Sequence, residues 1–323
     1  MKILWLSENE IAGKIPRDFS QMRTEMAWIC ASDAEHYHIG ELPNLKDNSY
    51  DVAIIILPKN EGMLQQMSTY NGFDLVGNLR RVAKKIGWMQ EGPVHFFQDY
   101  QVSIQVWWYG VLSKMDFLMV HNENDAKYIK GLFDKSIFVN RSLMIEDALP
   151  KAGMMKKIEG RHEALIGGNF VSWYGSFDSY MIALEFETDI VAPTMGRMPK
   201  DESQVEGLNH IQYKTWHDWM ITLSVCKYAV HLMPTHAAGT FALNAGFLGI
   251  PCIGYKGLDT QEILHSELSV DLRDLESARK LACRLKNDKD FYNHCSEDAM
   301  NAYKHYYTEE IWKNNFNKFL EEI

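Results

Sequence analysis

An unbroken run of apolar residues, "VAIIIL" from Val52 to Leu57, limits the possible folds of this chain more than any other stretch. Such a continuous, β-branched run is typical of a parallel strand that is buried on both faces of its sheet. The run is also far shorter than the roughly 20 residues that a helix needs to cross a bilayer. It therefore predicts an α/β protein with a parallel sheet.

Strand-like and helix-like segments alternate over the first half of the chain. The predicted strands are residues 2–8, 51–58, 93–99, 117–120 and 136–140, and the predicted helices are residues 17–32, 73–87 and 123–133. Asn122 stands where it would cap the last of these helices. Strands that alternate with helices predict a doubly wound parallel sheet.

The segment "LPKAGMMKKIEGRHE", residues 149–163, contains proline, two glycines and clustered charges without a clear period, which is typical of a connection between domains. A second alternation of strands and helices follows it. We therefore predict an N-terminal domain over residues 1–155 and a C-terminal domain over residues 156–306, both Rossmann-like. A closing helix at about 307–323 can pack back on the first domain.

Composition restricts the possible functions. The formal net charge of -10 disfavours a nucleic-acid partner. The five cysteines form no CxxC pair, and neither an HExxH nor a DxD motif occurs, so no metal site is predicted. The N-terminus shows no export signal, and no segment is predicted to cross a membrane. The sequence predicts a protein of the cytoplasm, or of the host cytoplasm if a phage encodes it.

The stretch "HLMPTHAAGTFALNAGFLGIPCIGYK", residues 231–256, predicts a strand, a turn of small residues, an apolar helix and another strand. Gly239 would let the backbone approach a ligand closely. Thr240 and Phe241 would then present free amide groups at the start of a helix, where the helix dipole favours an anion. The alternative is an ordinary strand-to-helix turn. The pattern indicates a site for phosphate groups.

These two halves, with this stretch in the second, resemble the GT-B glycosyltransferases, and in particular the retaining family with a Glu-x7-Glu motif. The match retains Gly239, Ala245 and the Gly-Ile-Pro step at 249–251. His236 and Asn244 stand where that family has its two glutamates. The resemblance implies that His236 contacts the transferred sugar and that Asn244 binds the hydroxyl groups of the donor ribose.

The same resemblance locates the groups that neutralise the donor diphosphate. The family usually has an arginine and a lysine early in the C-terminal domain, but here "GGNFVSWYGS" has Asn169 and Tyr174 at those places. Asn169 is retained as a donor-binding candidate. Arg197 and Lys200, from "TMGRMPK", are the cations expected near the diphosphate.

In the N-terminal half, "VHFFQDYQ" is similar to a strand end of the T-even phage DNA α-glucosyltransferases, which are distant GT-B relatives. The similarity implies a catalytic role for Asp99, although an aspartate at a strand end is also a common helix cap. Gly13 and Lys14 are expected in the first strand–helix loop, facing the acceptor, and His121 at the end of another strand. An ordinary loop with a solvated lysine is the alternative for Gly13 and Lys14.

We therefore predict a hexosyl- or pentosyltransferase that retains the anomeric configuration, uses a UDP- or GDP-sugar, and needs neither metal nor cofactor. A glycan, glycolipid or metabolite acceptor is favoured over a hydroxylated base in phage DNA. A DNA acceptor predicts a basic stripe beside the cleft, formed by Arg80, Arg81, Lys84 and Lys85. The alternatives are a non-catalytic binding or scaffold protein with the same fold and, third, a nucleotide-sugar epimerase.

Overall fold

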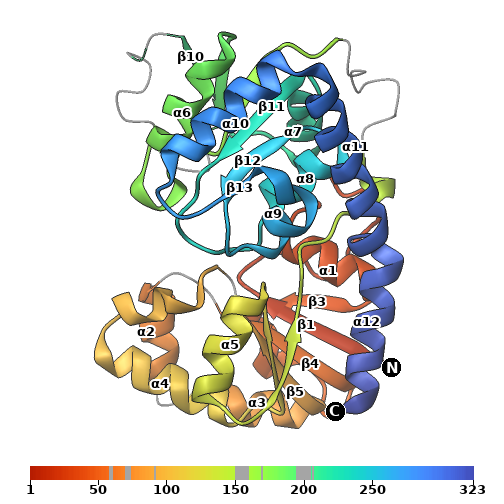
Figure 1. The fold of residues 1–323 in the computed structure, drawn as a ribbon. Helices are drawn as coiled ribbons and strands as arrows, with labels where there is room; N and C mark the ends of the chain where they lie inside the picture. The colour runs from red at the N-terminus through yellow and green to blue at the C-terminus, as the bar shows by residue number, and fades with distance from the viewer. Residues whose placement is uncertain are drawn as a thin grey trace. The chain divides into compact units, whose positions relative to one another are not determined.

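A computed structural model describes residues 1–57, 61–69, 74–90, 92–149, 160–168, 170–193, 205 and 207–323. The chain divides into two compact units (Figure 1). Unit 1 comprises Met1–Arg17, Thr24–Arg141 and Glu309–Ile323, and unit 2 comprises Asp18–Arg23 and Ser142–Thr308. Each unit is built around its own sheet.

Within the described residues, the sheet of unit 1 has seven strands in the order β2-β3-β1-β4-β5-β6-β7. The strands are β1 (Ile3–Ser7), β2 (Gly13–Lys14), β3 (Glu35–His38), β4 (Tyr50–Ile56), β5 (Ala83–Met89), β6 (Phe117–Val120) and β7 (Ser136–Val139). All neighbours pair in parallel except β2, which runs antiparallel to β3. The apolar run at residues 52–57 forms most of β4, as its composition predicts.

Helices pack on both faces of this sheet. They are α1 (Glu25–Ala31), α2 (Glu61–Thr69), α3 (Leu75–Val82), α4 (Val102–Ser113), α5 (Glu123–Leu132) and α12 (Glu309–Glu322). On one face, α3, α4 and α5 contribute Leu79, Ile104 and Ile129 to the core. On the other face, Trp5 is fully buried and its ring centroid lies 6.4 Å from that of Phe316 on α12. The last helix therefore completes the core of the unit that begins the chain.

Unit 2 has a six-stranded sheet in its described part, ordered β10-β9-β8-β11-β12-β13 and parallel throughout. Its strands are β8 (Glu163–Ile166), β9 (Ile190–Pro193), β10 (Leu208–Ile211), β11 (Cys226–His231), β12 (Cys252–Tyr255) and β13 (Ser269–Val270). Its helices are α6 (Ser176–Ala183), α7 (Trp216–Ser224), α8 (Thr240–Phe247), α9 (Asp259–Leu264), α10 (Leu275–Asn287) and α11 (Lys289–Tyr306). The predicted fold class, two α/β units with parallel sheets, is confirmed.

Side-chain alternation shows that the sheet of unit 2 is also covered on both faces. Ala164 and Ile166 belong to the core cluster that includes Ile182 of α6 and Ala282 of α10. Leu165 lies between them in the strand, points to the opposite face and is also fully buried. Both faces of the sheet are therefore shielded from water, as expected for parallel strands.

Three predicted elements are wrong in type or extent. The helix predicted at 73–87 ends at Val82, and residues 83–89 form β5, because Gly87 packs directly beneath the ring of Phe117 in the neighbouring strand. Residues 94–99 form a 3-10 helix, η2 (Val94–Asp99), instead of a strand. The first predicted helix is confined to Glu25–Ala31.

Two further expectations concern the connection between the domains and membrane-spanning helices. Residues 150–159, where we predict the connection between domains, lie outside the described residues. None of the helices in the described part of the chain combines the length and the apolar character that crossing a membrane requires.

Candidate functional site

The strand order of unit 2 places a topological switch point at the carboxyl edge of its sheet. β8 lies between β9 and β11, so the connection that follows β8 runs toward one side and the connection that follows β11 runs toward the other. Open α/β sheets bind ligands where two such connections diverge. The loops after β8 and β11 therefore define the candidate site.

An imidazole packed on a glycine lies at this switch point. His231 ends β11, and a Cβ atom placed on Gly167, directly after β8, would lie 2.1 Å from Cδ2 of His231. The imidazole therefore lies against the bare backbone at Gly167. Its ring centroid is 4.7 Å from that of Phe241 in the first turn of α8. Burial lowers the pKa of His231 to about 4, so the ring is neutral near neutral pH.

The start of α8 has the features predicted for an anion site. Gly239 precedes the helix with φ of 72°, in the left-handed region, and makes no side-chain capping hydrogen bond. A Cβ atom there would lie 2.0 Å from Oγ1 of Thr260, so only glycine fits. Thr240 and Phe241 follow as the first helical residues, whose amide groups have no partner within a helix. These amides are available to a negatively charged ligand.

Contacts between the two loops hold this edge in place. Thr235 donates a hydrogen bond of 2.9 Å from its hydroxyl group to the carbonyl oxygen of Trp173. The amide of Leu232 donates to Oγ of Ser179 at 2.9 Å. Gly175 has φ of 60°, and a Cβ atom there would lie 1.8 Å from the carbonyl oxygen of Leu232. The loops after β8 and β11 are thus joined by backbone and hydroxyl groups.

The two residues at the glutamate positions of the resembled motif lie close to this helix start. His236 is partly buried, and its imidazole packs on Gly257, where a Cβ atom would lie 2.4 Å from Nε2 of His236. Asn244 lies in α8 and is 1% exposed, and its Oδ1 atom has no hydrogen-bond partner among the described residues. A buried acceptor without a partner is uncommon and is accounted for by a water molecule or a ligand.

Three donor-site candidates, Asn169, Arg197 and Lys200, lie outside the described residues. Tyr174, which stands where the resembled family has a lysine, ends the short 3-10 helix η6 (Ser172–Tyr174) in the loop after β8.

Gly13 and Lys14 lie in the connection between β1 and α1, as expected, but not at the edge of the sheet where a site is expected. They form β2, which pairs antiparallel with β3, and Lys14 lies opposite Glu35 at the beginning of β3. Since the parallel strands bind ligands at their carboxyl ends, Lys14 is at the opposite edge of the sheet. Its Nζ atom lies 2.7 Å from Oδ1 of Asp33. This lysine therefore has a surface ion pair in place of the expected site role.

His121 and Asp99 also differ from their predicted settings. His121 follows β6 as expected, but it is only 3% exposed, packs against Trp28, and accepts a hydrogen bond from the amide of Gly92 at 3.2 Å. Asp99 is exposed and ends η2, ten residues after β5 ends at Met89. The structure therefore gives His121 a packing role and removes Asp99 from the strand end.

The basic residues that a DNA acceptor requires do not form a free stripe. Arg80 and Arg81 pair with Asp116 and Asp47, Lys84 pairs with Asp51, and Lys85 donates to the carbonyl oxygen of Ile323. These four residues end α3 and begin β5, so they lie at the amino edge of the sheet. Both observations argue against the basic stripe that a DNA acceptor would require.

Two groups of polar residues were not predicted. His231 has a detectable signal, since it lies in a predicted strand that leads into the glycine turn. The second group is Glu267, His294 and Asp298, whose ligand atoms all lie within 4.8 Å of one another. Glu267 is far from the other two in sequence, so only the fold brings them together.

No family model matches the chain, and a search of curated protein sequences also finds no match. Solved structures do match. TarM from S. aureus superposes with a TM-score of 0.63 at 13% identity, over 90% of this chain and 60% of TarM. HepE from Anabaena, in complex with UDP-glucose, gives a TM-score of 0.70 at 9% identity over 100% of both chains. The chain has the GT-B fold.

A third GT-B structure, trehalose-6-phosphate synthase, gives a TM-score of 0.62 at 11% identity over 99% of this chain and 93% of that protein. The present chain therefore spans the whole length of HepE and 60% of the length of TarM. The similarity of the fold confirms the GT-B architecture that the sequence predicts.

Proposed function

We propose that the protein transfers a sugar from a nucleotide diphosphate sugar to an acceptor hydroxyl, and that unit 2 binds the donor. The observation that carries the proposal is the uncapped start of α8, which Gly239 turns toward the carboxyl edge of the sheet. A diphosphate has the charge and the acceptor oxygens that such a helix start binds. HepE, which shares the fold, has been solved with UDP and with UDP-glucose.

The chemistry follows from where negative charge develops. When the bond between the anomeric carbon and the diphosphate oxygen breaks, the bonding electrons go to the diphosphate. The amide groups of Thr240 and Phe241 are already oriented toward this charge and need no rearrangement to stabilise it. The acceptor oxygen bonds to the anomeric carbon, and its proton passes to the diphosphate oxygen that leaves. The neutral imidazole of His231 supplies a ring nitrogen beside the same helix turn.

Roles for the two motif positions extend the proposal. Asn244 would bind the ribose hydroxyl groups, since its Oδ1 atom has no partner among the described residues. His236 would contact the transferred sugar, with Asn169, Arg197 and Lys200 as further donor-binding residues. Asp99 would serve the acceptor side from the end of η2.

UDP-glucose bound to HepE supports a UDP-hexose donor for this chain. The trehalose-6-phosphate synthase structure was determined to study glycosyl transfer with retention, which supports the same stereochemistry here. Because Arg80, Arg81 and Lys84 are paired with carboxylates, we propose a glycan, glycolipid or small-molecule acceptor in preference to DNA.

A thermal-shift panel with UDP, GDP, ADP, CMP and their sugar conjugates tests the donor site. A nucleotide at 100 times its dissociation constant should stabilise the protein by about 2.7 kcal/mol. Replacing Thr240 with aspartate places a carboxylate where the diphosphate binds, yet an acidic residue in a first helical turn is favourable for the folded state. We expect Thr240→Asp to fold normally and to weaken nucleotide binding by at least about tenfold.

The matched control is Asn124→Asp, which adds the same charge to the first turn of α5 in unit 1. Equal loss of affinity in both variants would contradict a local site at α8. If no nucleotide binds the unaltered protein, the non-catalytic interpretation replaces this one. A bound donor that yields only its isomer, with no acceptor consumed, would indicate an epimerase.

A further inference from the structure

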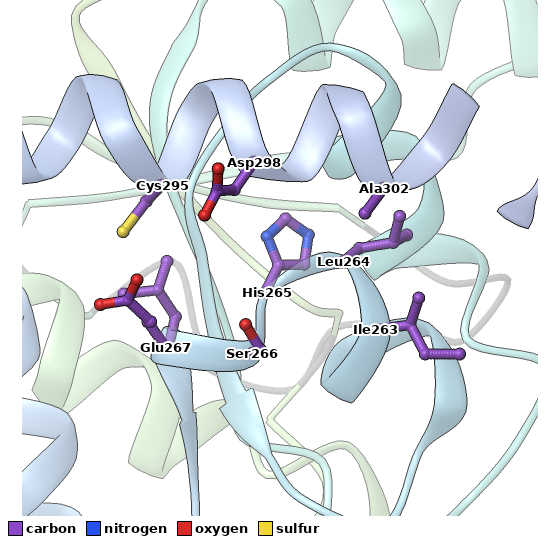
Figure 2. Close-up of a pocket in the computed structure, with 9 residues that line it drawn as sticks. Ile263, Leu264, His265, Ser266, Glu267, Cys295, Asp298 and Ala302 are labelled. Atoms are coloured by element: carbon purple, nitrogen blue, oxygen red, sulfur yellow. The ribbon is translucent and has the colours of Figure 1, made fainter. Parts of the chain in front are cut away.

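A pocket of about 200 Å³ lies in unit 2 beside the loop that follows α9 (Figure 2). Helix α11 forms one side with Cys295, Asp298 and Ala302. The loop after α9 forms the other side and includes His265 and Glu267. The GT-B reaction proposed above uses none of these side chains.

Three exposed side chains converge beside this pocket. His294 and Asp298 stand one turn apart on α11, and Glu267 belongs to the short 3-10 helix η9 (Ser266–Leu268). Nε2 of His294 lies 2.6 Å from Oε1 of Glu267 and 3.3 Å from Oδ2 of Asp298. One nitrogen and two carboxylate oxygens therefore face a single point that an ion can reach from solvent.

A buried histidine adds an independent observation. His265 is 3% exposed, and its Nε2 atom lies 3.1 Å from the carbonyl oxygen of Ala242. Because a carbonyl oxygen only accepts, Nε2 carries the proton and Nδ1 carries a lone pair. Nδ1 has no hydrogen-bond partner among the described residues. Figure 2 shows the ring of His265 pointing toward helix α11, which carries Asp298.

We propose that Glu267, His294 and Asp298 bind a divalent transition-metal ion, with Zn²⁺ preferred, and that His265 accepts a hydrogen bond from a water molecule on this ion. Imidazole nitrogen and carboxylate oxygen are zinc ligands, and three of them leave one position for water. The nitrogen ligand disfavours Mg²⁺ and Ca²⁺, which take oxygen ligands.

The setting of His265 is typical of histidines around metal ions. Outer partners of a metal site orient its ligands by hydrogen bonds, and a bond from one ring nitrogen to a backbone carbonyl fixes which nitrogen faces the site. Here the carbonyl is that of Ala242 in the first turn of α8, so Nδ1 is left for the pocket. Without an ion, the three exposed side chains form an ordinary surface ion-pair cluster, and Nδ1 of the buried His265 has no partner in the described part of the chain.

Calorimetric titration of the EDTA-treated protein with ZnCl₂ tests the proposal, and CoCl₂ adds a visible absorption spectrum that reports the coordination of the ion. We expect one Zn²⁺ per chain and no binding of MgCl₂ at the same concentrations. The variants His294→Ala and Asp298→Asn should lose binding. Because both side chains are exposed, these changes should leave the fold intact.

Two further variants separate the site from general surface binding. His305→Ala removes another histidine of α11 and should bind Zn²⁺ like the unaltered protein. His265→Gln retains a donor to the carbonyl oxygen of Ala242 but removes the acceptor at the pocket, so the dissociation constant should rise about tenfold to hundredfold. The proposal fails if the unaltered protein binds no Zn²⁺, or if His294→Ala binds it as tightly as His305→Ala does.

Discussion

The two units have sheets of the same design, but they complete the carboxyl edge in different ways. In unit 1 the strand order reverses between β1 and β4, and in unit 2 it reverses between β8 and β11. At the end of β1, Oγ of Ser7 donates to Nε2 of His36 at 2.9 Å, and Nδ1 of His36 donates to the carbonyl oxygen of Ile11 at 2.5 Å. The edge beside β1 is thus filled by the unit's own polar groups.

Unit 2 leaves polar groups unpaired at the corresponding edge. The start of α8 has no side-chain cap, and the buried atoms Oδ1 of Asn244 and Oγ1 of Thr260 have no partners among the described residues. Helix α5 of unit 1, by contrast, is capped by Asn122, whose side chain accepts from the amide of Asp125 at 2.8 Å. The comparison supports the proposal that the unsatisfied groups of unit 2 bind the donor, whereas the satisfied groups beside β1 maintain the fold.

The largest effect should come from the glycine that opens α8. Gly239→Ala meets Oγ1 of Thr260 and retains an unfavourable φ, so the free energy of unfolding should fall by about 2–4 kcal/mol. Adding Thr260→Ala should restore the steric part of this loss, which urea denaturation of the single and double variants would measure. If Gly239→Ala is as stable as the parent, the close approach of these two residues is wrong.

The next largest effect should come from the hydrogen bonds of Ser7 and His36 in unit 1, whose loss should lower the free energy of unfolding by about as much as one unpaired buried group does. Ser7→Ala leaves Nε2 of His36 without its donor, and we expect a loss of about 1–3 kcal/mol in unfolding free energy. Nucleotide affinity, measured by calorimetry, should not change, because this network belongs to unit 1. If Ser7→Ala greatly weakens nucleotide binding and leaves stability unchanged, the ligand would bind at the edge of unit 1 and not at that of unit 2.

His231, at the carboxyl edge of the sheet of unit 2, should make the free energy of unfolding depend on pH. Its pKa is lowered from 6.5 to about 4, so on acidification the unfolded chain binds a proton before the folded chain does. Its contribution to stability is therefore present above pH 6.5 and is lost as the pH falls toward 4, by about 1–2 kcal/mol for a partly exposed ring. His231→Gln should flatten this part of the stability profile, and an unchanged slope would show that the ring titrates normally.

The smallest effect should come from the capped helix. Asn122→Ala removes the cap of α5 and should lower the free energy of unfolding by about 1 kcal/mol, as is usual for a lost N-cap. Asn122→Asp retains an acceptor for the amide of Asp125 and serves as the control. Nucleotide binding should stay the same in both variants, and a change in the alanine variant alone would connect α5 to the ligand.

The sequence predicts most of this architecture because buried parallel strands and amphipathic helices have distinct periods. Val52 to Leu57 could hardly be anything but a central strand. The failures occur where a period is ambiguous: the apolar and basic residues from Ala83 to Gly87 have a spacing that also suits a helix. These residues nevertheless form part of β5, where Gly87 packs against Phe117 of the neighbouring strand. Contacts of this kind depend on the neighbouring strand and leave no local pattern.

The candidate sites show the same difference between features set by local sequence and features set by distant contacts. The glycine turn at 239 is local, so its place at a helix start follows from the sequence. The edge of the sheet on which a residue lies is not local, and this is why Lys14 was expected at the wrong edge. The zinc ligands Glu267 and His294 come from separate elements, so no spacing rule could identify them.

Helix α12 has a consequence for how the chain folds during synthesis. It supplies Phe316 to the core of unit 1. It also supplies Trp312, whose indole N–H group donates a hydrogen bond of 2.8 Å to Oδ1 of Asn140. These residues are translated after all of unit 2, so the unit that is begun first cannot be completed until α12 has been synthesised. All residues of unit 2, which ends at Thr308, are translated before α12. The order of folding should therefore be the reverse of the order of translation, and removal of the last 15 residues should expose Trp5 while the sheet of unit 2 persists.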